Sequence, residues 1–226
     1  MQLSTLVIAL LTAVLVWTLL IRRLSAKPWI QAGAIDAAHN AGPTTLPAAK
    51  IGLWIFLGVI TSLFALFFTA YMMRMDPHHA AGVTWVPFDK PAFLWVNTLL
   101  LILGSLSMQW ARTGESQGRI NTLKTGLTAS GFCIIGFLVG QIVAWNQVRE
   151  AEFFALTNPA VGFFYLLTAV HGLHILGGLW VWAGATLRIW RADKVISASL
   201  TVELCTVYWH YLLLVWLILF GLLLST

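Results

Sequence analysis

Charged residues are scarce in this chain. Aspartate, glutamate, lysine and arginine make up 9% of its 226 residues, against about 25% in an ordinary soluble domain. Hydrophobic residues make up 59%, with twelve tryptophans and thirteen phenylalanines. A soluble core cannot bury this much apolar surface. The composition therefore excludes an ordinary soluble protein and indicates one that lies in a lipid bilayer.

Reactive motifs are also missing. The two cysteines, Cys133 and Cys205, lie far apart in apolar segments, which excludes a disulfide framework and a zinc pattern and favours two buried small hydrophobes. The sequence has no glycine-rich phosphate loop, no Ser/His/Asp grouping and no CxxC pair. It also lacks the closely spaced intramembrane carboxylates that proton relays use. These absences favour a packing partner over a catalytic chain.

Long apolar runs dominate the rest of the chain. They predict six spans, near residues 3–22, 51–73, 92–111, 125–146, 161–188 and 200–224. Each is expected to be helical, because a lone span must satisfy its own backbone in lipid, and none alternates in polarity like a barrel strand. The predicted fold is an all-α, polytopic membrane helical bundle with six transmembrane helices.

Basic residues gather in alternate linkers. Ten of the thirteen follow spans 1, 3 and 5. They are Arg22, Arg23, Lys27, Lys50, Arg112, Arg119, Lys124, Arg188, Arg191 and Lys194. The positive-inside rule puts these linkers in the cytoplasm and both termini in the periplasm. The net charge of +5 is therefore a topology signal, and we expect no nucleic-acid partner.

The chain divides into three parts. Residues 1–27 are expected to be an N-terminal transmembrane helix, retained as an anchor because its positive charges follow the apolar stretch, the reverse of a cleaved signal. Residues 28–49, with three prolines and two glycines, are expected to be a cytoplasmic linker. Residues 50–226 form a block of five predicted helices.

Ionisable side chains stand inside the last two spans. His171 and His174 are three residues apart and share a helix face. Glu203 and His210 are two turns apart, with Thr206 on the same face. Three histidines and a glutamate are in principle a metal-ligand set, but we favour hydrogen bonds between helices. His78 and His79 in an outer linker are likewise expected to be solvated rather than metal-bound.

Two other spans carry polar packing signals. Span 3 contains Asn97, and span 4 contains the GxxxG pair Gly136 and Gly140, followed by Gln141. Small residues let helices approach closely, and amide side chains bond across them, so Gln141 is expected to bond a neighbouring helix. Most tryptophans near the span ends fit interfacial belts.

Four stretches carry a resemblance to one family. Residues 50–57 (KIGLWIFL) are similar to the start of its conserved five-helix block, and residues 97–111 have its NT, serine and WA pattern. Residues 163–177 contain FF, HGLH and a following glycine, the most specific signal, and residues 203–216 contain E, YWH and VW. In this order the chain resembles subunit III of the haem–copper oxidases, the cytochrome c oxidase and quinol oxidase group.

The resemblance implies a non-catalytic subunit in a bacterial inner membrane. The family has two unequal helix groups around a V-shaped cleft that binds phospholipid, and the larger group docks on catalytic subunit I. Haem and copper are expected on partner subunits and no cofactor on this chain, apart from bound phospholipid. The side chains predicted to fix helix packing or lipid contacts are His171, His174, Glu203, His210, Asn97, Gln141 and Trp209.

Three departures from the family stand out. A glutamate that many relatives carry on the block's first helix falls near Ile60 here, and an aspartate that some carry on the closing helix falls at Leu213. One helix is predicted before the block, where larger relatives have two. The sequence does not distinguish whether the complex that contains this subunit is a cytochrome c oxidase, a quinol oxidase or a nitric oxide reductase. Alternatives from other classes are an independent transporter and a haem-binding electron carrier.

Overall fold

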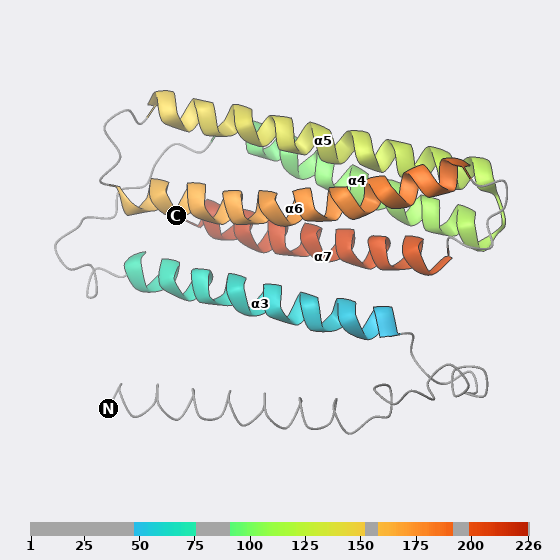
Figure 1. Ribbon diagram of the computed structural model, residues 1–226. Helices are drawn as coiled ribbons and strands as arrows, with labels where there is room; N and C mark the ends of the chain where they lie inside the picture. The colour runs from blue at the N-terminus through green and yellow to red at the C-terminus, as the bar shows by residue number, and fades with distance from the viewer. Residues whose placement is uncertain (1–47, 76–90, 152–157, 192–198, 226) are drawn as a thin grey trace, which may run out of the picture. The chain divides into compact units, whose positions relative to one another are not determined.

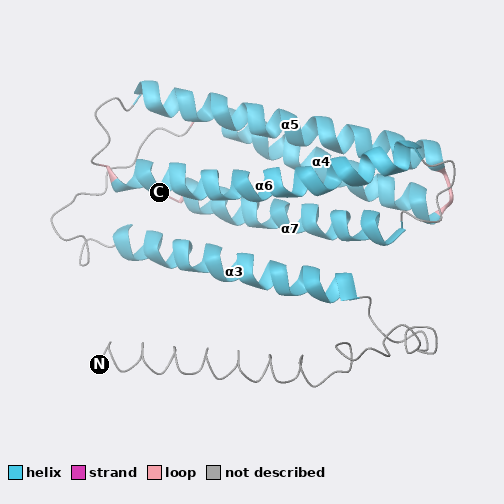
Figure 2. Cartoon of the chain, viewed as in Figure 1, coloured by secondary structure: helices cyan, strands magenta, loops and turns pink. Residues whose placement is uncertain are grey.

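Five long α-helices make up the part of the chain that the computed structural model describes, residues 48–75, 91–151, 158–191 and 199–225 (Figures 1 and 2). They are α3 (Ala48–Met75), α4 (Phe93–Ser116), α5 (Ile120–Ala151), α6 (Pro159–Arg191) and α7 (Ser199–Leu224). All five are long and apolar enough to cross a membrane, and no strand occurs within these ranges. The prediction of an all-α membrane bundle is confirmed for these five spans. The predicted N-terminal helix, the linker up to residue 47 and His78 and His79 lie outside the described residues.

The helices are longer than their apolar cores. The helix predicted near 161–188 runs from Pro159 to Arg191, and α3 begins at Ala48, inside the predicted linker. Lipid sets only a minimum length of about 20 residues, and the backbone continues as helix into the interface. Proline is suited to the first helical position, and Asn158 Oδ1 accepts the amide of Ala160 at 3.1 Å. Local capping, rather than hydropathy, therefore determines where α6 begins.

The helices α4 and α5 form the closest pair. A short turn joins them, in which Gly118 has φ +68°, a left-handed conformation that glycine adopts readily. Along the pair, a Cβ added to Gly126 would lie 2.8 Å from the Cα of Ala111. The two backbones thus approach as closely as glycine permits, which is how small residues drive association in membranes.

The helix α3 makes fewer contacts with the block than the other helices do, and these are mainly with α6 and α7 (Figure 1). Its buried residues, Leu57, Ile60, Phe64 and Tyr71, are spaced by three, four and seven positions and so form one stripe. Ile60, at the place where many relatives carry a glutamate, is 2% exposed within this stripe. Most of the remaining surface of α3 is exposed.

Candidate functional site

A buried histidine joins α6 to α7. His171 is fully buried, and its Nε2 lies 3.1 Å from the backbone oxygen of Leu212. A carbonyl only accepts hydrogen bonds, so Nε2 carries the proton. The imidazole lies 5.2 Å from the ring of Trp216 and 5.8 Å from that of Phe137. Its Nδ1 has no hydrogen-bond partner among the described residues. His171 therefore acts as an interhelical donor inside an aromatic cluster.

His174 lies one turn further along α6. Its Nδ1 donates to Val170 O on its own helix at 2.8 Å, and its ring lies 5.6 Å from Phe64 of α3. Its own carbonyl accepts the Tyr208 hydroxyl at 2.9 Å. The two histidines share a helix face, as predicted. One belongs to the core, however, and the other is only partly buried.

Two buried amides face each other between α4 and α5. Asn97 Nδ2 donates to Gln141 Oε1 across a long 3.4 Å, and the two side chains are 0% and 3% exposed. Asn97 Oδ1 and Gln141 Nε2 have no conventional partner among the described residues. The Oδ1 atom occupies the place that a Cβ on Gly140 would take. It therefore faces a Cα–H group of Gly140, a weak contact typical of close helix pairs.

The helices are also linked by side chains that were not predicted to fix helix packing. Trp216 Nε1 donates to Thr98 Oγ1, and Trp145 Nε1 donates to Thr168 Oγ1, each at 2.9 Å. The Tyr165 hydroxyl donates to the carbonyl of Trp145 at 2.9 Å. One signal was present: Trp216 stands well inside its span, where an interfacial belt does not explain it.

Glu203 pairs with cations from two other helices. Its carboxylate lies 2.7 Å from Lys50 Nζ of α3 and 3.5 Å from the Arg112 guanidinium of α4. The sequence placed both cations in linkers, whereas the structure places them in helices. Because α3 and α7 begin at this end of the block, the ion pairs fix the two helix starts beside α4.

His210 and Trp209 make no side-chain hydrogen bond to another described helix, although Trp209 belongs to the buried core. His210 is exposed, and its Nδ1 bonds the carbonyl of Thr206 on its own helix at 2.7 Å. Trp209 is 3% exposed, and its Nε1 has no partner among the described residues. The structure also does not bring the three histidines and Glu203 together as a metal site. No group of three or more histidine, cysteine, aspartate or glutamate side chains in the described ranges could hold a metal ion.

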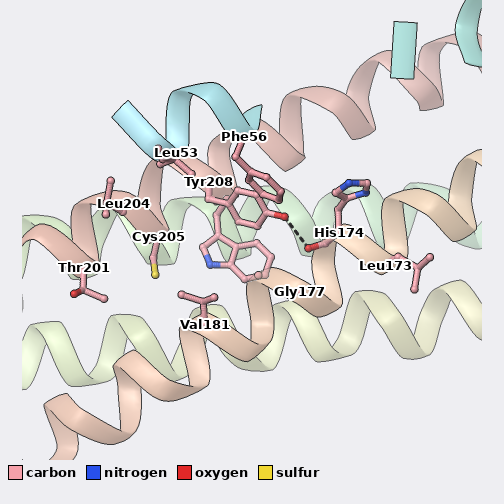
Figure 3. Close-up of a pocket in the computed structure, with 13 residues that line it drawn as sticks. Leu53, Phe56, Leu173, His174, Gly177, Val181, Thr201, Leu204, Cys205 and Tyr208 are labelled. Carbon is pink, nitrogen blue, oxygen red and sulfur yellow. Dashed lines mark hydrogen bonds between the residues drawn. The ribbon is translucent and has the colours of Figure 1, made fainter. Parts of the chain in front are cut away.

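An apolar cavity of about 590 Å³ opens between α3, α6 and α7 (Figure 3). Its walls include Phe56 of α3, His174 and Gly177 of α6, and Cys205 and Tyr208 of α7. The Tyr208 ring stacks with Phe56 at 6.1 Å, and its hydroxyl is already bound by His174 O. Few polar atoms thus face the cavity, whose size is typical of ligand pockets, about 300–1,000 Å³.

Comparisons with known proteins identify the family of the chain. The family model described as Cytochrome c oxidase subunit III matches residues 1–224. The chain is 27% identical over 174 residues to cytochrome c oxidase subunit 3 of Bacillus subtilis, covering 75% of this chain and 82% of that protein. It is 26% identical over 194 residues to cytochrome c oxidase subunit 3 of Thermostichus vulcanus, covering 84% and 91%. It is also 26% identical over 191 residues to cytochrome bo(3) ubiquinol oxidase subunit 3 of Pseudomonas aeruginosa, covering 82% and 86%. The chain therefore belongs to the cytochrome c oxidase subunit III family and is a haem–copper oxidase subunit III.

Proposed function

We propose that the chain is a non-catalytic subunit that docks on catalytic subunit I of a bacterial cytochrome c oxidase and stabilises it. Family membership implies association with other oxidase subunits. The observation that carries the rest of the proposal is how the buried polar groups are used. His171, Asn97, Thr98 and Thr168 each bond another helix of the block. Such bonds stabilise a transmembrane bundle by about 0.6–2 kcal/mol each and provide packing rather than chemistry.

A phospholipid chain in the cavity is the second part of the proposal. The cavity lining is mostly aliphatic and aromatic, which suits an acyl chain and offers little to a polar ligand. Lys50 lies about one turn before Leu53 of the cavity, and Glu203 directly precedes its Leu204. Across this end of the block, Lys50, Arg112, Lys124 and Arg188 outnumber Glu115 and Glu203, which favours an anionic phosphate there.

The orientation follows from the same charges. Lys50, Arg112, Lys124 and Arg188 lie at the end of the block where α3 and α7 begin. Under the positive-inside rule this end faces the cytoplasm of a bacterial inner membrane and the termini face the periplasm. Lys124 Nζ lies 5.5 Å from the ring centre of Trp190, an arrangement suited to the headgroup layer.

Purification of the native complex tests the docking. We expect affinity-tagged subunit I to bring this chain with it, and mass spectrometry to show one assembly. His171→Ala and Glu203→Ala are expected to lower the amount of assembled oxidase while the surviving complex keeps its normal haem content. Absence of this chain from the oxidase, or haem loss from the intact complex, would contradict the proposal.

Two matched glycine variants test the lipid site. Gly177 and Gly184 are both exposed on α6, and neither would place a Cβ within 4 Å of another atom, but only Gly177 lines the cavity. We expect Gly177→Leu to fill the cavity and reduce the phospholipid retained per purified complex, while Gly184→Leu leaves it unchanged. Equal lipid content in both variants and the parent would refute the site.

A quinol oxidase is the second candidate host. Relatives named for cytochrome c and for ubiquinol oxidases match this chain at nearly equal identity, 27% and 26%. Turnover of the purified complex with reduced cytochrome c and with ubiquinol decides between them, because only one donor should sustain oxygen consumption.

A further inference from the structure

The start of α3 is held to the block less firmly than the rest of the helix. The buried residues of α3 are Leu57, Ile60, Phe64 and Tyr71. None lies among residues 48–56, which are exposed or half-buried. Three residues of this segment, Gly52, Leu53 and Phe56, form the α3 wall of the apolar cavity (Figure 3). The segment 48–56 therefore flanks the cavity, and the anchored part of α3 begins at Leu57.

One ion pair ties this segment to α7. Lys50 Nζ lies 2.7 Å from the Glu203 carboxylate. Within the described part of the chain, this pair is the only hydrogen bond or ion pair that a side chain of residues 48–56 makes. The other attachments are apolar: Leu53 packs on the core, and Phe56 stacks with Tyr208 at 6.1 Å. The pair joins the α3 and α7 walls at the end of the cavity where both helices begin.

The ion pair is built so that it can exchange. The Lys50 and Glu203 side chains are 27% and 29% exposed, and part-exposed ion pairs are weak. Glu203 also has a second cation, since the Arg112 guanidinium of α4 lies 3.5 Å away. A carboxylate without any partner would be costly in a part-buried place. Glu203 avoids that cost, because it can release Lys50 and stay paired with α4.

The helix is also softened where its anchored part begins. The Leu57 carbonyl accepts a hydrogen bond from the Thr61 hydroxyl at 2.8 Å, and the Tyr211 hydroxyl of α7 reaches the same oxygen at 3.3 Å. The Gly58 carbonyl accepts the Ser62 hydroxyl at 3.0 Å. Such side-chain bonds compete with the helix ladder and bend helices, and glycine lowers helix propensity. The backbone next to Leu57 is therefore suited to act as a hinge for residues 48–56.

The proposed ligand supplies the partner that Lys50 would take on release. A phospholipid phosphate is anionic and accepts charge-assisted hydrogen bonds from an ammonium group. A headgroup at this end of the cavity lies beside the wall that carries Lys50. It therefore competes with Glu203 for the same ammonium group.

We propose that the Lys50–Glu203 ion pair is a latch on the lipid cavity, which an anionic phospholipid headgroup opens by binding Lys50 while Glu203 stays paired with Arg112. When the latch is open, residues 48–56 swing about the backbone next to Leu57 and widen the cavity, so that lipid enters or leaves. The inference rests on the proposed function, because it describes how the proposed lipid site exchanges its occupant.

Lipid release from the purified oxidase complex tests the latch. Deuterated phosphatidylglycerol is loaded into the complex, and its replacement by unlabelled lipid is followed by native mass spectrometry. We expect Lys50→Met to accelerate release about 1.4- to 5-fold, the range of one part-exposed ion pair. Lys50→Arg should keep the parent rate, because it keeps the charge.

The matched control is the other cation on the same carboxylate. Arg112→Met leaves the Lys50–Glu203 pair in place and removes the partner that Glu203 needs when the latch opens, so release should not accelerate. Ion pairs that only stabilise the fold would instead act in the same direction. Acceleration in both Lys50→Met and Arg112→Met, or in neither, overturns the latch.

A second comparison tests the role of the headgroup. In the parent complex, release should be faster when the competing lipid is phosphatidylglycerol than when it is diacylglycerol with the same chains, because only the former carries a phosphate. In Lys50→Met this difference should disappear. Equal release with both lipids in the parent overturns the proposed opening step, although the lipid site stands. If the purified complex retains no phospholipid, the proposed lipid site itself fails.

Discussion

A single methyl group at Gly140 should disrupt the contact between α4 and α5. In Gly140→Ala the new Cβ would take the place of Asn97 Oδ1 and lie 2.7 Å from a ring carbon of Phe93. Asn97 cannot withdraw easily, because it is fully buried. Gly136, the other glycine of the same GxxxG pair, differs: its Cβ would meet only the side chain of Leu100, at an ordinary 3.5 Å and 3.8 Å. The motif therefore contains one essential and one replaceable glycine.

The magnitude follows from the two contacts that are lost. Overpacking of a well-filled core costs about 1–3 kcal/mol, and displacement of Asn97 breaks its bond to Gln141, which contributes about 0.6–1.7 kcal/mol. Alanine favours the helix over glycine by up to about 1 kcal/mol, but this gain applies equally to both positions. Gly140→Ala should therefore be less stable than Gly136→Ala by about 2–5 kcal/mol.

Unfolding of the detergent-solubilised protein by a denaturing detergent measures this difference. The free energy of unfolding is compared for the parent, each single variant and the double variant Gly140→Ala with Asn97→Ala. Removing the Asn97 amide should recover part of the loss, because the methyl group then has room. Equal stability of Gly136→Ala and Gly140→Ala, or a double variant no better than the sum of its parts, would refute the proposed packing.

Three further outcomes are expected from the same assay. Glu203→Gln should lower the free energy of unfolding by about 0.5–1 kcal/mol at low salt and by less at high salt, because its ion pairs are part-exposed; a salt-independent loss contradicts this. His171→Ala should destabilise by about 2–4 kcal/mol through the cavity it leaves, and His171→Leu by clearly less, since leucine fills space and removes the unpaired Nδ1. Gly178→Ala should destabilise by about 1–3 kcal/mol, because its methyl group collides with the Tyr208 ring, whereas Gly177→Ala should stay near the parent; reversal of that order would contradict the contact.

The apolar spans were predictable because hydrocarbon imposes a simple rule on sequence. A run of about 20 apolar residues has few alternatives to a helix in lipid, so the five predicted spans that fall within the described residues appear where expected. Helix ends were less predictable. Asn158 and Pro159 start α6 through local capping, a signal that hydropathy does not contain. Lys50 similarly belongs to α3 although its charge suggested a linker.

Side-chain partners were harder to foresee than helices. Helical spacing put His171 and His174 on one face, but did not reveal that one is buried and the other partly exposed. Rotation about the helix axis decides this, and rotation depends on neighbours distant in sequence. Glu203 showed the same limit, because its partners Lys50 and Arg112 are 153 and 91 residues away. The family match favours an oxidase subunit over the transporter and haem-carrier alternatives.

Backbone oxygens accept many of the bonds between these helices. His171 bonds the carbonyl of Leu212, Tyr208 that of His174 and Tyr165 that of Trp145. A peptide oxygen is present whatever residue occupies the accepting position. The genetic requirement is thus one-sided: the donor must be kept, whereas the accepting residue is free to drift as long as the helix stays in register. Searches for paired substitutions across these helices should therefore miss such bonds. Variants substituted at the accepting positions should retain the bonds, because the backbone oxygen is still present.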